Sequence, residues 1–187
     1  MNPRSAALLV IDVQHGFVNR HSQGVVPAIV DLVKRWQSIG APAVFTQFRN
    51  EPGSPYETIT GWTKLRTEAE QAFVGELSPC VDVADAVIDK QQSSAFTQEG
   101  TQLIRSRGWT DLVLCGIDTD ACVYDTAIDA YQSGVRPWIV TDACASTGGP
   151  TYHDAALLLA TRNIGADQLL TSKQVLDQIG VPQGGRP

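Results

Sequence analysis

The chain has 187 residues with a formal net charge of −6, and 43% of its residues are hydrophobic. This length and composition suit one folded domain over residues 1–187, with a frayed tail from about residue 182, and exclude general disorder. The acidic balance argues against a nucleic-acid partner, and the apolar runs are too short to span a membrane.

The cysteines and the N-terminal residues indicate in which cellular compartment the protein is expected. The four cysteines are widely spaced and form no CxxC pair, so the sequence predicts neither a zinc site nor a disulfide framework. The first residues lead directly into an apolar hexamer that is too short for a secretory signal peptide. We therefore expect a cytoplasmic protein.

Short runs rich in Val, Ile and Leu alternate with longer amphipathic stretches, which is the pattern of repeated βα units. The predicted strands are residues 6–13, 42–47, 86–89, 111–116, 136–141 and 168–171. The predicted helices are residues 26–38, 67–77, 97–107, 121–133, 152–163 and 172–178. Several strands lack polar alternation, as in parallel sheets with both faces covered. The sequence predicts an α/β fold, a three-layer α/β/α sandwich around a mostly parallel, six-stranded Rossmann-like sheet.

One segment interrupts this alternation. Residues 49–67 contain two prolines, two glycines and the aromatic residues Tyr56 and Trp62. A loop of this length inside a compact domain is usually functional or disordered. Its aromatic residues favour a packed flap.

Reactive side chains follow three of the predicted strands. Asp12 ends the first strand, Lys90 follows the third, and Cys122 lies in the first turn of the helix after the fourth. Ligands of open parallel sheets bind beyond the carboxyl ends of the strands, so these residues are candidates for chemistry. Each also has a structural interpretation: Cys122 as a packing residue, Lys90 as a solvated lysine, and Asp12 as a turn or cap residue. Together they supply a nucleophile, a base and a cation.

The motifs around these residues resemble the isochorismatase-like cysteine hydrolases, a family that includes nicotinamidases, N-carbamoylsarcosine amidohydrolases and isochorismatases. The most specific motif is residues 116–123, GIDTDACV. It is supported by residues 9–14 (LVIDVQ), by Lys90 with residues 94–96 (SAF), and by residues 141–145 (TDACA). The resemblance runs from Leu8 to about Thr171.

This resemblance implies an Asp-Lys-Cys triad at Asp12, Lys90 and Cys122. Asp12 would be the general base and then the acid to the leaving amine, and Lys90 would orient Asp12 and stabilise the thiolate. Cys122 would attack the carbonyl to form a thioester. The resemblance also implies a cis peptide bond between Ile117 and Asp118, which would aim the backbone N–H groups of Asp118 and Cys122 at the oxyanion.

The sequence departs from the family pattern in two places. Metal-binding members carry an Asp-x-His pair after the second strand, whereas this chain has TQFRN at residues 46–50 and no histidine between His21 and His153. No metal is therefore expected, and no nucleotide cofactor either, because the glycine-rich phosphate motifs are absent. The second departure is the acidic Asp118, since a carboxylate near Cys122 would raise the pKa of the thiol.

Three residues are candidates for substrate binding. Arg49 follows the second strand and could hold a substrate carboxylate, with a surface arginine as the alternative interpretation. Phe17 and Trp62 could form a pocket wall or pack the flap.

The leading functional hypothesis is a metal-independent amidohydrolase that acts on a small amide, carbamoyl or ureido substrate. The alternatives are isochorismatase-type vinyl-ether hydrolysis, which does not obviously need the thiol, and a non-catalytic binding protein that retains the fold. By analogy with the family we expect a homo-oligomer, a dimer or a tetramer.

Overall fold

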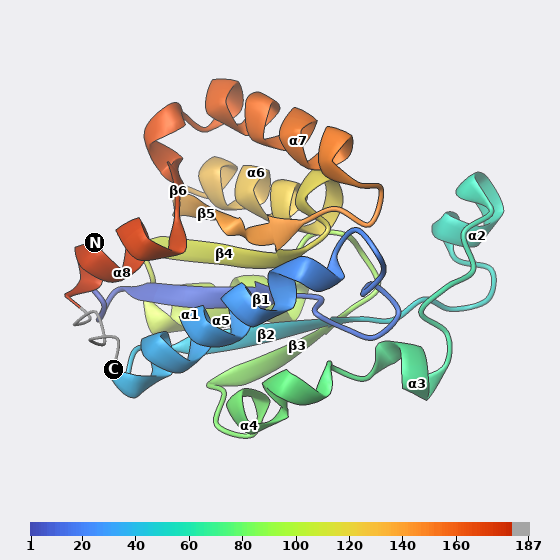
Figure 1. Ribbon diagram of the computed structural model, residues 1–187, viewed down its shortest axis with the longest axis horizontal. Coiled ribbons are helices and arrows are strands. Elements are labelled where there is room, and N and C mark those ends of the chain that lie inside the picture. The colour runs from blue at the N-terminus through green and yellow to red at the C-terminus, as the bar shows by residue number, and fades with distance from the viewer. Residues whose placement is uncertain (181–187) are drawn as a thin grey trace.

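Six parallel strands form a sheet at the centre of the molecule, in the order β3-β2-β1-β4-β5-β6 (Figure 1). The strands are β1 (Ala6–Ile11), β2 (Ala43–Phe48), β3 (Ala86–Lys90), β4 (Asp111–Ile117), β5 (Arg136–Ala145) and β6 (Leu169–Leu170). The structure is a computed structural model that describes residues 1–180. The predicted frayed tail from about residue 182 lies outside these residues.

Helices cover both faces of the sheet, which confirms the predicted three-layer architecture. The helices are α1 (Val26–Ser38), α2 (Pro55–Thr60), α3 (Glu68–Gln71), α4 (Ser78–Val81), α5 (Gln98–Arg107), α6 (Tyr124–Gln132), α7 (Pro150–Asn163) and α8 (Ser172–Ile179). Single turns occur at η1 (Gln23–Val25), η2 (Gly75–Leu77), η3 (Thr119–Val123) and η4 (Ala166–Gln168).

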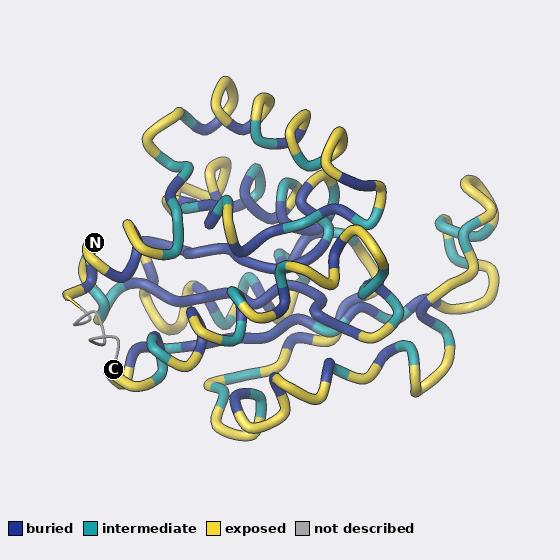
Figure 2. The backbone as a smooth tube through the Cα atoms, viewed as in Figure 1, coloured by how far each residue is buried: buried dark blue, intermediate teal, exposed yellow. Residues whose placement is uncertain are grey.

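Side chains of β1 alternate between two buried clusters because successive residues of a strand point to opposite faces. Leu8 and Val10 belong to a cluster with α1 and α8. Leu9 and Ile11 belong to a second cluster with α5, α6 and α7. Figure 2 shows the central strands β1 and β4 buried along their length, while the outer sides of the helices are exposed. The core on each face holds the carboxyl ends of the strands in place.

The structure corrects the predicted helix at residues 67–77. Helix α3 ends at Gln71, and the backbone is extended at Ala72 and Val74. The extended stretch pairs with the segment after β1: the His15 N–H donates to Ala72 O at 2.9 Å, and the Val74 N–H donates to Val13 O at 3.2 Å. These long-range hydrogen bonds replace the helical ones, so tertiary pairing overrides local helix propensity.

Two other elements differ from the predictions. Strand β5 continues to Ala145 because, beyond a register shift in β4, Cys144 and Ala145 pair with Gly116 and Ile117. The predicted loop at residues 49–67 contains α2, whose start and end have recognisable sequence signals. Ser54 is its N-cap, Pro55 occupies the first turn, and Gly61 ends it in a left-handed conformation.

Gly116 allows β4 to approach β1 closely beside Asp12. Its φ is +128°, and a Cβ atom there would lie 2.1 Å from the Ile11 carbonyl oxygen. Only glycine has no side chain at this point and tolerates such a backbone conformation. The approach brings the end of β1 next to the loop that leads to Cys122.

Candidate active site

The strand order brings the three predicted residues to one edge of the sheet. Asp12 directly follows β1, Lys90 is the last residue of β3, and Cys122 lies in η3, the turn between β4 and α6. Because all strands are parallel, their carboxyl ends meet at this edge. The helix predicted to begin at residue 121 begins at Tyr124 as α6, because residues 121–123 belong to η3, a turn with π-helical hydrogen bonding.

Asp12 and Lys90 form a buried ion pair. Lys90 Nζ lies 2.7 Å from Asp12 Oδ2, and both side chains are fully excluded from solvent. The other carboxylate oxygen accepts a hydrogen bond from Thr46 Oγ1 at 2.6 Å. The Thr46 hydroxyl in turn accepts the Asp12 N–H at 3.2 Å. Both oxygens of Asp12 are therefore held, which fixes the carboxylate in one orientation.

Lys90 is held by four groups. Besides Asp12, its ammonium donates to Gln92 O at 3.0 Å and to Ser93 O at 2.7 Å. It also lies 5.0 Å from the centre of the Phe48 ring, a cation–π distance. Burial is the largest single effect and lowers the pKa of Lys90, but Asp12 and Cys122 together, through charge and hydrogen bonding, outweigh burial and hold this pKa above its ordinary value. The lysine is therefore a fixed positive charge.

Cys122 is buried, and it lines a cavity. Burial raises the pKa of its thiol well above the ordinary value, and the Asp12 carboxylate raises it further, while Lys90 lowers it. At neutral pH the thiol is therefore protonated at rest. A neutral thiol next to an ionised carboxylate can react when the carboxylate takes its proton.

The turn before Cys122 contains the Ile117–Asp118 peptide bond, which is cis, at the position that the resemblance implies. The Asp118 side chain accepts hydrogen bonds from the Thr147 N–H at 2.5 Å and from Thr147 Oγ1 at 2.8 Å. Burial raises the pKa of Asp118 to about 6, against the lowering effect of the Thr147 hydrogen bonds. Asp118 also contributes to the raised pKa of Cys122, the effect expected from the sequence.

The cavity beside Cys122 has a volume of about 500 Å³ and an aromatic wall. Phe17 and Trp62 stack with ring centres 6.0 Å apart, and Tyr56 lies edge-on to Phe48 at 5.2 Å. The wall thus joins the segment after β1 to α2 and the loop that follows it. The two predicted aromatic residues, Phe17 and Trp62, line the cavity with Cys122.

The structure places Arg49 apart from this cavity. Its guanidinium forms a 3.0 Å ion pair with Asp89 and donates to Gln71 and Gln47. On extended backbone, side chains two residues apart point to the same side. The side chain of Arg49 therefore points to the same side as that of Gln47, opposite to the side chain of Phe48. Its hydrogen-bonding capacity is directed to neighbouring side chains.

The sequence did not point to Thr46, which supports Asp12, or to most of the residues that line the cavity. Thr46 lies inside an apolar strand, and a buried polar residue there is the one signal that could have marked it. Phe48 and Tyr56 are recognisable in the sequence as aromatic residues, but the sequence does not indicate that their side chains face the cavity. The other lining residues missed are Gly16, Asn19, Thr60, Lys64, Ser93, Ala121, Thr147 and Gly148.

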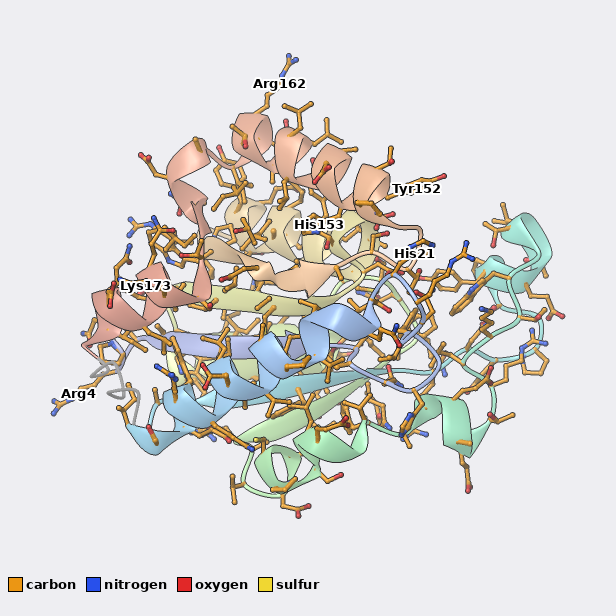
Figure 3. All side chains as sticks on the ribbon, in the orientation of Figure 1. Arg4, His21, Tyr152, His153, Arg162 and Lys173 are labelled. Atoms are coloured by element: carbon orange, nitrogen blue, oxygen red, sulfur yellow. The ribbon has the colours of Figure 1, made fainter. Side chains whose placement is uncertain are left out.

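The histidines lie outside the triad. His153 of α7 points toward η3, where its Nδ1 lies 2.8 Å from Thr119 Oγ1, and this contact ties α7 to the turn that carries Cys122 (Figure 3). Burial lowers the pKa of His153. Within residues 1–180, no group of three or more His, Cys, Asp or Glu side chains is placed to hold a metal ion. No helix in the same range is long and apolar enough to cross a membrane.

Comparison with known proteins agrees with this geometry. Residues 6–172 match the Isochorismatase domain family. The chain is 32% identical to the uncharacterized isochorismatase family protein YwoC of Bacillus subtilis, over 94% of this chain and 95% of that protein. It is 29% identical to the phenazine biosynthesis protein PhzD1 of Pseudomonas aeruginosa, over 95% of this chain and 87% of that protein.

A solved structure shares the fold over nearly the whole chain. The crystal structure of N-carbamoylsarcosine amidase from Thermoplasma acidophilum superimposes with a TM-score of 0.78 and 26% identity, covering 92% of this chain and 97% of that one. The family match, the parallel sheet and the residues at its carboxyl edge lead to the same conclusion. The chain belongs to the isochorismatase family of hydrolases.

Proposed function

We propose that the chain is a cysteine hydrolase that cleaves a C–N bond of a small amide, carbamoyl or ureido substrate without a metal ion. The observation that carries this proposal is the placement of Cys122, which lines the cavity next to the buried Asp12–Lys90 pair. The likeness to an amidase supports a C–N bond as the target. The sequence TQFRN at residues 46–50, in place of the Asp-x-His pair of the metal-binding members, is the reason that the proposal includes no metal ion.

The first half of the reaction forms a thioester. The Cys122 thiol proton passes to Asp12 while the sulfur attacks the carbonyl carbon, and the carbonyl π electrons move to the oxygen. Protonated Asp12 then gives this proton to the substrate nitrogen, and the C–N bond breaks as the carbonyl re-forms. Ammonia or an amine leaves, and the acyl group stays on Cys122.

The second half releases the product. Water attacks the thioester carbonyl and loses a proton to Asp12, and collapse of this intermediate breaks the C–S bond. Asp12 returns the proton to the sulfur, so the resting thiol and carboxylate are restored. Lys90 keeps its charge throughout, and its contacts with Asp12 hold the carboxylate against Cys122 in both halves.

The backbone N–H groups of Asp118 and Cys122 are proposed as the donors to the oxyanion. Both residues line the cavity, and both belong to the turn between β4 and α6. Two N–H groups on one turn can point at one oxygen atom, and they need no rearrangement as charge develops there.

A second candidate reaction is vinyl-ether hydrolysis, as the family name suggests. The Asp12–Lys90 pair could protonate an ether-type substrate without a covalent intermediate. The reactive position of Cys122 favours the amide reaction, since a thiol that lines the cavity next to a base has no role in the ether reaction.

The test uses Cys122→Ala with a panel of carboxamide, carbamoyl and ureido compounds and one vinyl ether. Ammonia or amine release by the wild-type protein is expected to fall by about 10³-fold or more in the variant. A mass increase on Cys122, trapped during turnover, would report the thioester.

Cys80→Ala is the matched control, because Cys80 is also buried but lies in α4, away from the cavity. It should keep the wild-type rate. Amide hydrolysis at the full rate in Cys122→Ala would overturn the covalent mechanism, and vinyl-ether cleavage that survives in that variant would favour the second reaction.

We also propose a reducing compartment, such as the cytoplasm, for this protein. All four cysteines are free and buried in the structure. Cysteines of proteins in oxidising compartments are more often paired in disulfides, so this pattern supports the proposal.

A further inference from the structure

Asp118 lines the cavity, and its carboxylate is bonded to Thr147, which lines the cavity as well. The carboxylate has no part in the proposed bond-making steps, which use only the backbone N–H of this residue. Thr147 donates one hydrogen bond to each carboxylate oxygen. A carboxylate can accept about four hydrogen bonds, so roughly two acceptor positions remain for another donor.

Thr147 acts as a clamp on the Asp118 carboxylate through its two hydrogen bonds, and this clamp is itself held in place. The carbonyl oxygen of Thr147 accepts a hydrogen bond from Asn19 Nδ2 at 3.1 Å, and Asn19 also lines the cavity. The carboxylate is therefore fixed by two residues from loops far apart in the sequence. A fixed acceptor at the wall of a cavity is suited to recognise a donor group of a ligand.

The charges around the cavity favour one sign of ligand. Of the charged side chains that line it within the described part of the chain, Asp118 is acidic and Lys64 is basic. Asp12 and Lys90 balance each other as an ion pair, and Arg49 is bound to Asp89. Among the charged residues that line the cavity in the described part of the chain, Asp118 is the acidic one, and no ion pair opposes its charge.

Burial of the ionised Asp118 carboxylate lowers the stability of the folded chain. Burial raises its pKa to about 6, which means that the fold disfavours the ionised form. Groups with such shifts are concentrated at functional sites, although a structural role can produce them as well.

We propose that the Asp118 carboxylate, oriented by Thr147, accepts hydrogen bonds from an N–H-bearing or cationic group of the substrate and excludes substrates with a carboxylate at that place. Substrates of this class are amides or ureido compounds that carry an ammonium or a further N–H group near the scissile bond. The inference rests on the proposed hydrolysis and narrows its substrate class. Asp118 is thus a specificity-determining residue.

The test compares three amides of similar length that differ in the charge of the far end: 4-aminobutanamide, pentanamide and succinamate. For the wild-type protein we expect kcat/KM to be highest for the ammonium compound and lowest for the carboxylate, with a ratio of about 100-fold between them. Asp118→Asn keeps the size and one acceptor of the side chain but removes its charge. This substitution should reduce the ratio by about tenfold or more.

Thr147→Val tests the hydrogen bonds that hold the carboxylate. It removes the Oγ1 hydrogen bond while the charge of Asp118 and the Thr147 backbone N–H donor stay, so the ratio should fall by less than in Asp118→Asn, by about two- to threefold. A structural role for Asp118 would instead lower the rates of all three amides equally in both variants. That result, or an unchanged ratio in Asp118→Asn, would overturn the inference.

Calorimetric binding of the same amides to Cys122→Ala provides a readout that needs no turnover. Tighter binding of the ammonium compound that is lost on adding Asp118→Asn would support the recognition role even if the hydrolysis proposal failed. Amide hydrolysis by the wild-type protein with no preference by charge, in rate or in binding, would overturn the inference and leave the proposed function standing.

Discussion

At the scale of single residues, Thr46 fixes the position of Asp12, the proposed base. Its hydroxyl donates to one oxygen of Asp12 and accepts the Asp12 N–H, while Lys90 contacts the other oxygen. A buried carboxylate is costly unless its oxygens are paired. Thr46 is therefore a positioning residue, which acts through Asp12 and does not line the cavity.

We expect Thr46→Val to lower kcat by about 10- to 100-fold with little change in KM, because Asp12 loses one of its two supports. Thr46→Ser keeps the hydroxyl and should restore most of the activity. Steady-state kinetics of both variants would check this. A Thr46→Val enzyme with a raised KM and an unchanged kcat would contradict the assigned role.

At the scale of secondary-structure elements, helix α2 contributes to the wall of the cavity. It is short, and its N-cap Ser54 accepts the Glu57 N–H at 3.3 Å and donates to Asn50 Oδ1 at 2.6 Å. Figure 1 shows α2 set apart from the sheet, at the outer end of the segment that follows β2. The ring of Tyr56 nevertheless reaches back to Phe48 in the cavity wall. The position of this wall thus depends on a helix with few supports of its own.

Ser54→Ala should raise KM by about two- to tenfold and leave kcat nearly unchanged, since removal of the N-cap weakens only α2 and the aromatic wall. The control is Thr97→Ala, which removes the equivalent N-cap hydrogen bond of α5 to the Gly100 N–H. Because α5 packs against the sheet, this variant should lower the melting temperature without changing KM. Equal effects of the two variants on KM would contradict the separation of α2 from the core.

Electrostatics affects stability at the level of the whole molecule. The chain has a net charge of −6, and one of its carboxylates, Asp118, is held where burial raises the pKa from 3.8 to about 6. Between these values the folded chain binds more protons at this site than the unfolded chain does. The contribution of Asp118 to the free energy of unfolding therefore decreases as the pH rises from about 4 to about 6.

Asp118→Asn does not titrate, so the variant should gain stability relative to the wild type across this pH range. The gain should level off above pH about 7 at a value on the order of 3 kcal/mol at most, from a shift of about two pKa units. Urea unfolding of both proteins at several pH values would measure it. A stability difference that stays constant from pH 4 to pH 7 would show that the pKa of Asp118 is not raised by folding.

The local pattern of the chain was enough to predict the layers and most of their elements. Apolar runs bounded by turn residues correspond to the six strands, and the helix predicted at residues 26–38 is α1. The same pattern placed Asp12, Lys90 and Cys122 at the carboxyl ends of the first, third and fourth strands, and parallel strands end at one edge of the sheet. The caps of α2 were present in the sequence as Ser54, Pro55 and Gly61, but the prolines and glycines of residues 49–67 led to a loop prediction.

Contacts between distant residues decided the rest. The register of β1 with β2 pairs Ile11 with Thr46, which brings the threonine hydroxyl to Asp12. The register of β2 with β3 pairs Gln47 with Asp89, and Arg49 turns to that carboxylate instead of to the cavity. Thr147 reaches Asp118 only when the loop after β5 closes over the turn after β4. Such contacts depend on strand register and loop closure, and these are set by the packing of the whole chain, which no short window of residues encodes.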